Sequence, residues 1–549
     1  MSAVSVQAAG IGEQAQPYDY EVIVIGAGVS GICQIKRLVD LGISATVLEG
    51  NKNLGGTWYN NRYPGARFDS ESYTYGFSFS RELLDEWHWK ERFSPQPETL
   101  RYLNYVADKF DLRQYMQFGC KVEAMIFDEQ ADIWRLSLSD GRTLSARVVI
   151  TGLGPLSIPT LPKIEGVDDF KGTSFHPHHW PHDLTDLTGL RVAVVGTGAT
   201  AIQIIPEVAK QASQLTVFQR RANWAAPLNN GPIDQTEMND IRTRYDEIFA
   251  ACAESPGAFE HVPDSRSFYD VPADKRREFW DRLYDEPGFS IWLANFPEIF
   301  VDEQANAELS TYIADRIRQR VDDPKIAEKL IPTDHGFGVQ RLPLETGYFE
   351  TYNRDNVELV DSKETPIERI TPTGLQTSTR EFEFDVIIYA TGFDAFTGAY
   401  DHVDIRGIGG KKLRDVWAGG PTTYLGMFVS GFPNMAMLGG PQIAAANFPR
   451  GSEVAVDWIT PLLQRMRDGG HTRFNVSDAA QQGWFEEVKK SYEGLLINKA
   501  QSWFTGYNSN LEGHEYGNTR YTVYATGGVE YGKRLEEIAA GGYEGIDFS

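Results

Sequence analysis

The stretch EVIVIGAGVSG, residues 21–31, decides the fold of the first part of this 549-residue chain. Its opening five residues are mostly β-branched and apolar, as expected for a parallel strand that is covered on both faces. The glycine turn leads into a helical pattern that ends at Gly42, and a second strand, 45–48, runs into Glu49. This order of strand, glycine turn, helix, strand and acid predicts a dinucleotide-binding unit. A glycine-rich turn in an ordinary α/β sheet is the alternative.

Each glycine of this turn has a predicted task. Gly26 makes the tight turn, Gly28 lets a pyrophosphate approach the backbone, and Gly31 allows the helix to pack closely on the strand. The N-terminus of the helix then faces the phosphates. Glu49 can accept hydrogen bonds from a ribose diol but would repel a 2′-phosphate, so this unit suits a nucleotide with a free diol.

A second unit of the same kind begins at residue 191. Strand 191–195 is followed by a turn, a helix and the strand 215–218, and the turn consists of Gly196, Thr197, Gly198, Ala199 and Thr200 with the small residue Ala201 in third position. At the position equivalent to Glu49 stands Gln219, followed by Arg220 and Arg221. Because a guanidinium can pair bidentately with a phosphate, the second unit suits NADP. A solvated surface pair of arginines is the alternative.

Two different sites in one chain imply a reduced nicotinamide that passes hydride to a bound flavin, with FAD in the first site. Segments 148–152 and 386–392 are apolar strands that end in Thr-Gly, as expected where the chain crosses between two domains. The sequence thus predicts an α/β protein of two Rossmann-like domains with a helical insertion. The expected boundaries are a flexible tail at 1–17, an FAD domain at 18–155 and 390–549, an NADP domain at 156–225 and 335–389, and the insertion at 226–334.

Charge and cysteine usage narrow the class of protein. The formal charge of −24 argues against binding to nucleic acid or to an anionic membrane. Three widely spaced cysteines, Cys33, Cys120 and Cys252, form neither a disulfide framework nor a Cys-x-x-Cys pair. The N-terminal residues lack a signal peptide, and no segment reaches membrane-spanning length. We expect a cytoplasmic protein that is a monomer or a weak oligomer.

Between the two units lies a histidine-rich stretch, FKGTSFHPHHWP, residues 170–181. Its histidines and the one that follows it are His176, His178, His179 and His182. Composition alone suggests a metal site, while a surface loop and a hinge between two nucleotide-binding modules are the competing interpretations. No carboxylate or thiol cluster accompanies the histidines, which favours the hinge and predicts no metal.

The same stretch carries a family resemblance. The pattern formed by Phe170, Gly172, His176, Trp180 and Pro181 resembles the fingerprint of flavin-dependent Baeyer–Villiger monooxygenases, the relatives of cyclohexanone and steroid monooxygenases. Further segments that look like this family are 55–69, 218–220, 352–357, 390–395 and 500–503. The resemblance extends from about residue 18 to the C-terminus.

Membership of this family would imply a definite reaction. NADPH reduces FAD, O2 adds at the flavin C4a, and the peroxyflavin attacks a ketone, so that one oxygen atom is inserted next to the carbonyl to give an ester or lactone. The resemblance extends to oxygenation of sulfides. A flavin monooxygenase acting on nitrogen or sulfur nucleophiles is the alternative enzyme, and a catalytically silent flavin-binding protein is the alternative outside enzymes. The missing Cys-x-x-Cys argues against a flavin disulfide reductase.

The resemblance also assigns residues. Arg341 would stabilise the peroxyanion and the developing oxyanion, and Asp69 would orient Arg341 and tune the flavin environment. His176 and Trp180 would act in conformational change rather than in catalysis. The remaining residues that the resemblance places at the cofactors are Gly56, Thr57, Trp58, Tyr75 and Trp503.

Several positions depart from the family pattern. Gln340 stands where relatives carry a lysine that holds the 2′-phosphate, which leaves Arg220, with Arg221 as a substitute, and predicts a less strict preference for NADPH. Asn60 replaces a tryptophan and Phe68 a cysteine, both beside the flavin. The loop 506–519 is longer and more polar than in relatives.

Two further segments have an expected local structure. Residues 439–447 are expected to form a loop of small residues, and the Gly- and Tyr-rich end of the chain is expected to form strand-like pieces.

Overall fold

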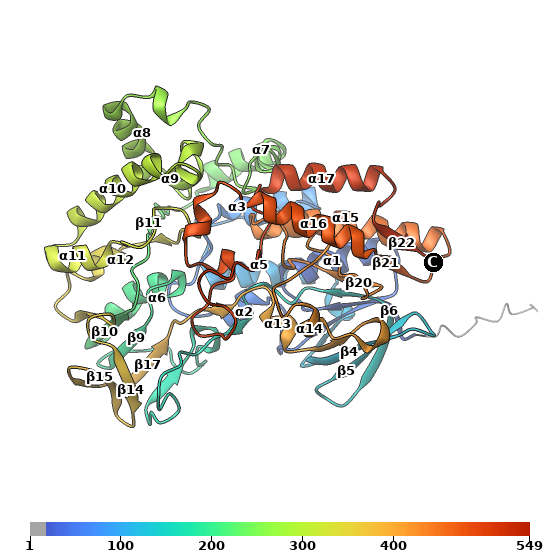
Figure 1. The fold of residues 1–549 in the computed structure, drawn as a ribbon, viewed down its shortest axis with the longest axis horizontal. Coiled ribbons are helices and arrows are strands. Elements are labelled where there is room, and N and C mark those ends of the chain that lie inside the picture. The colour runs from blue at the N-terminus through green and yellow to red at the C-terminus, as the bar shows by residue number, and fades with distance from the viewer. Residues whose placement is uncertain (1–17) are drawn as a thin grey trace, which may run out of the picture.

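The computed structural model describes residues 18–549, so the tail predicted at 1–17 lies outside the described residues (Figure 1). No helix within this range is long and apolar enough to cross a membrane. Nor do the described residues contain a group of three or more His, Cys, Asp or Glu side chains that could hold a metal ion.

The first unit forms the centre of an eight-stranded mixed sheet. Strand β1 (Tyr20–Ile25) pairs in parallel with β2 (Ala45–Glu49) and with β6 (Thr143–Thr151), while β4 and β5 add antiparallel pairs. The order is β19-β4-β5-β6-β1-β2-β3, and β20 also pairs with β6. The other strands are β3 (Met116–Phe118), β4 (Val122–Asp128), β5 (Ile133–Leu138), β19 (Asp404–Arg406) and β20 (Met435–Met437). The predicted strands 21–25 and 45–48 are confirmed.

Helices from both ends of the chain cover this sheet. Helix α1 (Val29–Asp40), which follows the glycine turn, packs against α15 (Phe448–Asp468) from the C-terminal part. The helical layer on this sheet is therefore complete only after the chain has returned from the second domain. The other helices of this part are α2 (Thr57–Asn60), α3 (Ser72–Tyr75), α4 (Arg81–Glu86), α5 (Gln96–Lys109), α13 (Gly398–Asp401), α14 (Leu413–Val416) and α16 (Asp478–Ser491).

The end of the chain corrects one expectation. Instead of strand-like pieces it forms helix α17 (Gly528–Ala540), followed by the short strand β22 (Ile546–Phe548), which pairs with β21 (Phe474–Val476). The buried residues Tyr531, Leu535 and Ile538 repeat at helical spacing. Glycine-rich flanks conceal this period, because they mark the ends of the helix rather than turns between strands.

The second unit forms a separate, five-stranded parallel sheet in the order β13-β10-β9-β17-β8. Its strands are β8 (Thr173–Phe175), β9 (Arg191–Val195), β10 (Gln214–Gln219), β13 (Val357–Asp361) and β17 (Val386–Tyr389), with α6 (Ala199–Ala209) after the turn. A small antiparallel sheet of β14 (Ile367–Thr371), β15 (Gly374–Thr377) and β16 (Glu381–Glu383) extends it. The two chain crossings lie side by side, because β7 (Ile158–Pro159) pairs with β18 (Phe393–Asp394).

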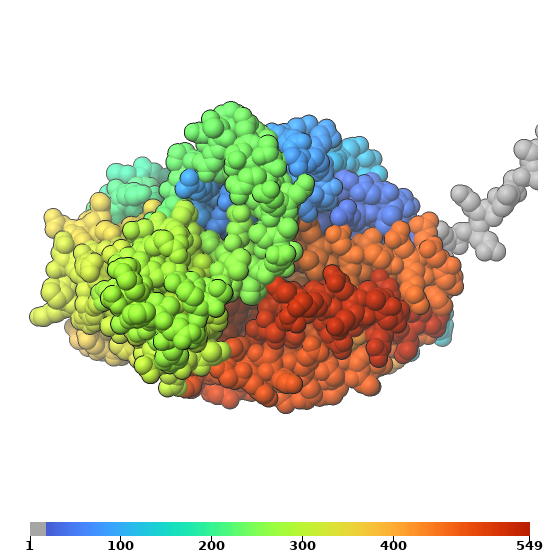
Figure 2. Space-filling view, turned by 90° about the horizontal axis from the view of Figure 1, so that it is seen from above, coloured from blue at the N-terminus to red at the C-terminus, as the bar shows by residue number. Residues whose placement is uncertain are grey.

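The predicted insertion is helical, but its helices belong to two cores. The buried face of α7 (Gln235–Glu254), with Met238 and Ile241, joins the core of the first domain. The later helices of the insertion join the core of the second domain: α8 (Ala273–Asp285), α9 (Ser290–Leu293), α10 (Glu303–Arg320) and α11 (Pro324–Leu330). Helix α12 (Tyr348–Thr351), which follows the insertion, belongs to the same core. Strand β11 (Ala226–Pro227), at the start of the insertion, pairs in parallel with β12 (Leu344–Glu345), which follows the insertion. In Figure 2 the green segment with α7 lies between the yellow-green helices and the red C-terminal part.

Candidate active site

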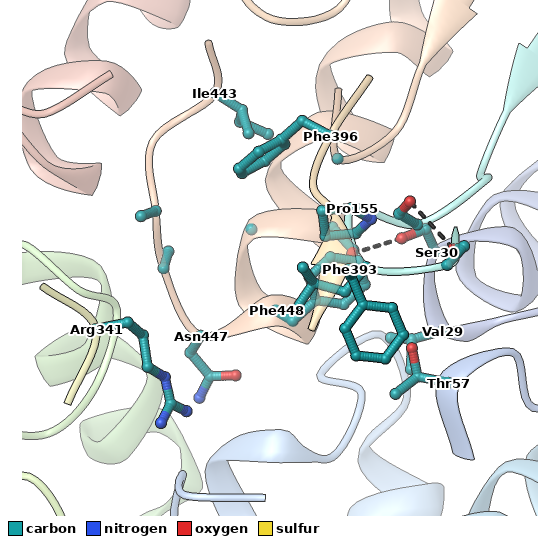
Figure 3. Close-up of a pocket in the computed structure, with 18 of the residues that line it drawn as sticks. Val29, Ser30, Thr57, Pro155, Arg341, Phe393, Phe396, Ile443, Asn447 and Phe448 are labelled. Atoms are coloured by element: carbon teal, nitrogen blue, oxygen red, sulfur yellow. Dashed lines mark hydrogen bonds between the residues drawn. The ribbon is translucent and has the colours of Figure 1, made fainter. Parts of the chain in front are cut away.

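A cavity of about 970 Å³ lies where the first domain, the insertion and the C-terminal segments meet. Its wall includes the first glycine turn, part of segment 55–69, Thr200 of the second turn and the loop 439–448. In Figure 3 Val29, Ser30 and Thr57 lie on one side of this pocket and Arg341 on the other. Both predicted dinucleotide turns therefore open toward a common space.

The first turn has the backbone that its predicted tasks require. Gly26 adopts φ +100°, and a Cβ there would lie 2.5 Å from the carbonyl oxygen of Gly152. A Cβ at Gly31 would lie 1.8 Å from the carbonyl oxygen of Gly26. Gly28 approaches Gly56, which has φ +53°. Side chains are thus excluded where helix, strand and ligand phosphates must come together.

The carboxylate of Glu49 is held in one orientation by its neighbours. Its Oε2 accepts a hydrogen bond of 2.8 Å from the backbone N–H of Ala27, and its Oε1 accepts two of 2.8 Å from Asn51. The side chain is buried yet lines the cavity. An oriented carboxylate beside an open phosphate-binding turn fits a dinucleotide with a free ribose diol.

Aromatic side chains build the wall next to this turn. Trp58 Nε1 donates a 2.9 Å hydrogen bond to the Tyr75 hydroxyl, and Phe68 stacks on Tyr75 with ring centroids 4.3 Å apart. Burial raises the pKa of Tyr75 above its usual range, so the phenol stays neutral. Phe68 therefore fills the position of the family's cysteine with a ring that fixes Tyr75.

The second glycine turn has the same backbone conformation as the first, but its second glycine has more free space around it. Gly196 adopts φ +110°, and a Cβ there would lie 2.5 Å from the carbonyl oxygen of Ala390. A Cβ at Gly198 would meet nothing within 4 Å, which leaves the phosphate side of the turn open. Thr197 Oγ1 donates to the carbonyl oxygen of Arg221 at 2.6 Å, and Ala199 lines the central cavity.

The two arginines after β10 have different surroundings. Arg220 lines a second cavity of about 800 Å³ beyond the ends of β10 and β13, and it donates to Ser509 Oγ of the C-terminal loop. Arg221 instead pairs with Asp334, Nε to Oδ2 at 2.7 Å. Arg220 is thus available to a ligand in the second cavity, whereas Arg221 already has a carboxylate partner.

Gln340 belongs to the same polar network. Its Nε2 donates to Asn223 Oδ1 at 3.1 Å and lies 2.6 Å from His335 Nε2, while His335 Nδ1 lies 2.7 Å from Asp334 Oδ1. Burial lowers the pKa of His335, so the ring is neutral, donates to Asp334 and accepts from Gln340. The residue that replaces the family's lysine therefore positions His335 instead of contributing a charge.

Asp69 and Arg341 meet in the wall of the central cavity. Arg341 NH1 lies 2.6 Å from Asp69 Oδ2, and the same nitrogen donates to the carbonyl oxygen of Leu342 at 2.8 Å. Burial raises the pKa of Asp69, although the guanidinium opposes the shift. Asp69 Oδ1 is buried with no hydrogen-bond partner among the described residues. An orphaned acceptor beside a cation fits a ligand that offers a hydrogen-bond donor at this point.

The histidine stretch runs from the second sheet to the first domain. Its residues 173–175 form β8, and His176 then packs edge-on against Phe393 at 5.0 Å. Burial lowers the pKa of His176 to about 3. Trp180 packs on Phe175 at 4.9 Å and donates to the carbonyl oxygen of Leu184. The fingerprint thus joins the sheet of the second unit to one of the chain crossings.

Comparison with known proteins agrees with this geometry. Residues 19–229 match the flavin-binding monooxygenase-like family. The 2-oxo-Δ3-4,5,5-trimethylcyclopentenylacetyl-CoA monooxygenase of Pseudomonas putida is 42% identical over 96% of this chain and 98% of its own length. Cyclohexanone 1,2-monooxygenase of Acinetobacter sp. is 36% identical over 97% of each chain. The solved structure of OTEMO with FAD and NADP superposes with a TM-score of 0.92 at 41% identity, over 97% of this chain and 100% of that one.

The chain is a type I Baeyer–Villiger monooxygenase. It is an FAD-containing, NADPH-dependent enzyme that oxidises ketones by inserting oxygen next to the carbonyl. The predicted α/β fold with two Rossmann domains is confirmed by the OTEMO structure, which holds both cofactors.

The sequence did not predict two features of this Baeyer–Villiger monooxygenase. His178 and His182, which are not among the fingerprint residues, contact the first domain: His178 Nδ1 lies 3.2 Å from Asn61 Oδ1, and His182 contacts Arg62. Burial, with His179 and Arg62 nearby, lowers the pKa of His178 to about 4. The only signal in the sequence is that Asn61 and Arg62 lie in segment 55–69, which also resembles the family.

The other missed feature is the docking of the C-terminal loop. Trp503 lines the cavity and packs against Phe396 at 5.8 Å, and the polar loop after it reaches the chain crossing. There Asn508 donates to the carbonyl oxygen of Phe393 at 2.9 Å, and Asn510 to that of Thr391 at 3.1 Å. The added polar residues of 506–519 thus bind backbone acceptors of the crossing.

Proposed function

We propose that this Baeyer–Villiger monooxygenase converts uncharged, largely apolar cyclic ketones to lactones, with Arg341 and Asp69 as the pair that acts at the reacting atoms. The observation that carries the proposal is the position of this pair, in the wall of a cavity onto which both glycine turns open. We assign residues 18–155 and 390–549 to FAD, 156–225 and 335–389 to NADP, and 226–334 to the closure of the cavity.

The chain's own groups would hold the cofactors as follows. The FAD phosphates and ribose fit the first turn and Glu49, and the NADP phosphates fit the second turn with Arg220 at the 2′-phosphate. Arg221 is the weaker candidate because Asp334 already pairs with it. The proposed FAD ligands are Gly26, Gly28, Gly31, Glu49, Gly56, Thr57, Trp58, Asp69 and Tyr75. The proposed NADP ligands are Gly196, Thr197, Gly198, Ala199, Thr200, Arg220 and Trp503.

When bound and reduced by NADPH, FAD would activate O2, from which the inserted oxygen atom comes. Arg341 would stabilise the negative charge that develops on the substrate oxygen, and a fixed cation does so without reorganisation during the reaction. Asp69 would hold the guanidinium in place through the 2.6 Å ion pair. Its second oxygen, Oδ1, remains free to accept a hydrogen bond from the cofactor or substrate.

The cavity wall supports the proposed substrate class. Large aromatic side chains and small apolar ones line the same cavity as Arg341, namely Phe259, Phe289, Trp292, Phe300, Phe396, Trp503, Ala444, Ala445 and Ala446. Such a wall excludes water, which strengthens the electrostatic effect of Arg341 on a bound ketone.

Two of the three Lys and Arg side chains in the described part of the wall are engaged in ion pairs. Among the described residues that line the cavity, Arg341 pairs with Asp69 and Arg67 with Glu91 at 3.2 Å. Lys121 follows Cys120, whose N–H donates to the carbonyl oxygen of Glu49 at 2.9 Å, so it lies at the nucleotide end. The Pseudomonas putida relative is named for a CoA thioester substrate. We propose that the present enzyme instead prefers a free ketone, because the described arginines of its cavity wall already have carboxylate partners and are not free to bind a CoA phosphate.

A panel of substrates tests the proposal. Free cyclic ketones of increasing size, a thioether, and a ketone-bearing CoA thioester with its free acid are each incubated with NADPH and O2. We expect lactone from the free ketones, in proportion to NADPH consumed, and slower turnover of the charged compounds. Sulfoxide without lactone from any ketone would reject the proposal, and preferred turnover of the CoA thioester would reject its substrate class.

The charge and the cysteines of the chain bear on its location and assembly. The formal charge of −24 disfavours contact with nucleic acid and anionic membranes, and all three cysteines are free and buried. These features support a cytoplasmic enzyme that works as a monomer or a weak oligomer.

A further inference from the structure

A second acid–base contact lies two residues after Asp69. Glu71 Oε1 and His261 Nε2 are 2.9 Å apart, and only 8% and 12% of the two side chains is exposed. Glu71 precedes α3 of the first domain, whereas His261 lies in the segment between α7 and α8 of the insertion. The segment 69–71 therefore reaches across to the other side of the cavity twice, through Asp69 to Arg341 and through Glu71 to His261.

The imidazole of His261 is bound on both nitrogens. Nε2 donates to Glu71 Oε1 at 2.9 Å, and the backbone nitrogen of Phe289 contacts the same atom at 3.2 Å without a hydrogen bond of its own, while Nδ1 lies 3.3 Å from Ser290 Oγ. His261 lines the cavity, but neither nitrogen is free to exchange a proton with a substrate. The ring therefore connects Glu71 with the backbone of Phe289 and the side chain of Ser290.

Phe289 connects this contact with Arg341. The guanidinium carbon of Arg341 lies 5.5 Å from the centroid of the Phe289 ring, within the range of a cation–π interaction. The backbone of the same residue approaches His261, at the start of α9. The preceding residue, Gly288, has φ +73°, and a Cβ there would lie 2.7 Å from Glu71 Oε1. The α9 start is therefore fixed by direct contact with Glu71 and His261.

We propose that Glu71 and His261 are positioning residues for Arg341, acting through the ring of Phe289. Asp69 fixes the guanidinium at its nitrogens, and the Glu71–His261 contact fixes the aromatic surface against which it packs. The inference rests on the proposed role of Arg341 at the reacting atoms. A displacement of about 1 Å at such a group is enough to reduce turnover about a hundredfold.

Three variants of the pair test the proposal in the holoenzyme. We expect Glu71→Leu and His261→Ala, which both remove the contact, to lower the lactone formed per NADPH consumed at least about tenfold, with the KM for NADPH changed no more than about twofold. His261→Gln retains a donor for Glu71 and should recover most of the yield. Since His261→Ala leaves a buried carboxylate unpaired and could unfold the chain, Glu71→Leu provides the variant without a stranded carboxylate.

His88→Ala is the matched control. His88 is also half-buried and also joins the first domain to the insertion, through a 3.2 Å contact with the carbonyl oxygen of Ile233, but it lies outside the cavity wall. It should leave the yield unchanged. Equal losses in His88→Ala and His261→Ala, in parallel with a lower melting temperature, would show a general structural effect and overturn the proposal.

The connection through Phe289 has its own readouts. Phe289→Leu should lower the yield, and adding His261→Ala to it should cost little more, because residues that act through one contact are not additive. Hydrogen exchange of residues 286–293, measured with and without bound cofactors, should accelerate in His261→Ala and not in His88→Ala. Additive losses together with unchanged exchange would overturn the proposal. If Arg341→Ala itself left the yield intact, the proposed function of Arg341 would fail as well; a loss in Arg341→Ala alone would reject only the present inference.

Discussion

The unit β1–α1–β2 and the unit β9–α6–β10 have the same backbone turn, yet their second strands end in different side chains. In the first, Glu49 is fixed by Ala27 and Asn51 and faces the central cavity. In the second, Gln219 turns away to the carbonyl oxygen of Lys329, and Arg220 faces the second cavity. The glycines thus give both turns the same backbone, and we propose that the residues at and just after the end of the second strand select the nucleotide.

The third position of each turn gives the largest expected difference. Gly31→Ala would place a Cβ 1.8 Å from the carbonyl oxygen of Gly26. The helix would have to move away from the strand, at a cost of about 3 kcal/mol, and the phosphate-binding N–H groups would move with it. Thermal unfolding and the FAD content per protein measure the two losses.

The second unit provides the control for this change. Ala201 occupies the equivalent place and is buried with its Cβ accommodated. Ala201→Gly should therefore cost only about 1 kcal/mol, the usual penalty for glycine in a helix. Similar losses of stability for Gly31→Ala and Ala201→Gly would mean that both turns pack alike, contrary to the distances in the structure.

Arg220→Ala should have the next largest effect. A hydrogen bond to a charged group contributes about 1.5–3 kcal/mol, so we expect the KM for NADPH to rise roughly 10- to 100-fold while the KM for NADH stays nearly constant. Arg221→Ala serves as the control, because Arg221 already pairs with Asp334 and should affect both coenzymes alike. Equal effects of Arg220→Ala on NADPH and NADH would sink its assignment to the 2′-phosphate.

The stretch between the two units should show a smaller effect. His176→Ala removes the ring that packs on Phe393, and we expect slower flavin reduction or several-fold more NADPH consumed without product, with FAD still bound. Because burial lowers the pKa of His176 to about 3, the wild-type ring stays neutral and its contribution should not vary between about pH 5 and 8. Rapid-mixing measurements of reduction and peroxide assays test this, with the exposed His179→Ala as control. Unchanged kinetics would refute the role.

The sequence predicted those parts of the site that depend on local rules. A turn that needs positive φ selects glycine, as at Gly26 and Gly196, and buried parallel strands select β-branched runs, so both units could be identified. Asp69 and Arg341 are distant in the chain, and only the family resemblance suggested them; the structure places them 2.6 Å apart.

What the sequence could not predict are the contacts made when the domains dock. The pairing of Arg221 with Asp334, and the contact of His178 with Asn61, join segments whose relative position depends on the whole fold. The division of the insertion between two cores has the same origin, because an amphipathic pattern shows that a helix has a buried face but not which partner covers it.

Gln340→Lys, which restores the lysine of the family pattern, should have the smallest effect. It tests how much one added charge raises the preference for NADPH over NADH. A lysine could still donate to His335, but it would lose the contact with Asn223 and place a cation near Arg221. Partly exposed ion pairs contribute about 0.2–1 kcal/mol, so the preference for NADPH over NADH should rise no more than about fivefold. Gln340→Met, which has similar length and no charge, is the control. The measurement is the ratio of kcat/KM for NADPH to that for NADH, at low and at high salt. If salt removes the gain in NADPH preference, the gain comes from the added charge. If salt leaves the gain intact, or if Gln340→Met shows it too, the gain comes from the release of His335 and Asp334, and this network rather than Arg220 would select NADPH.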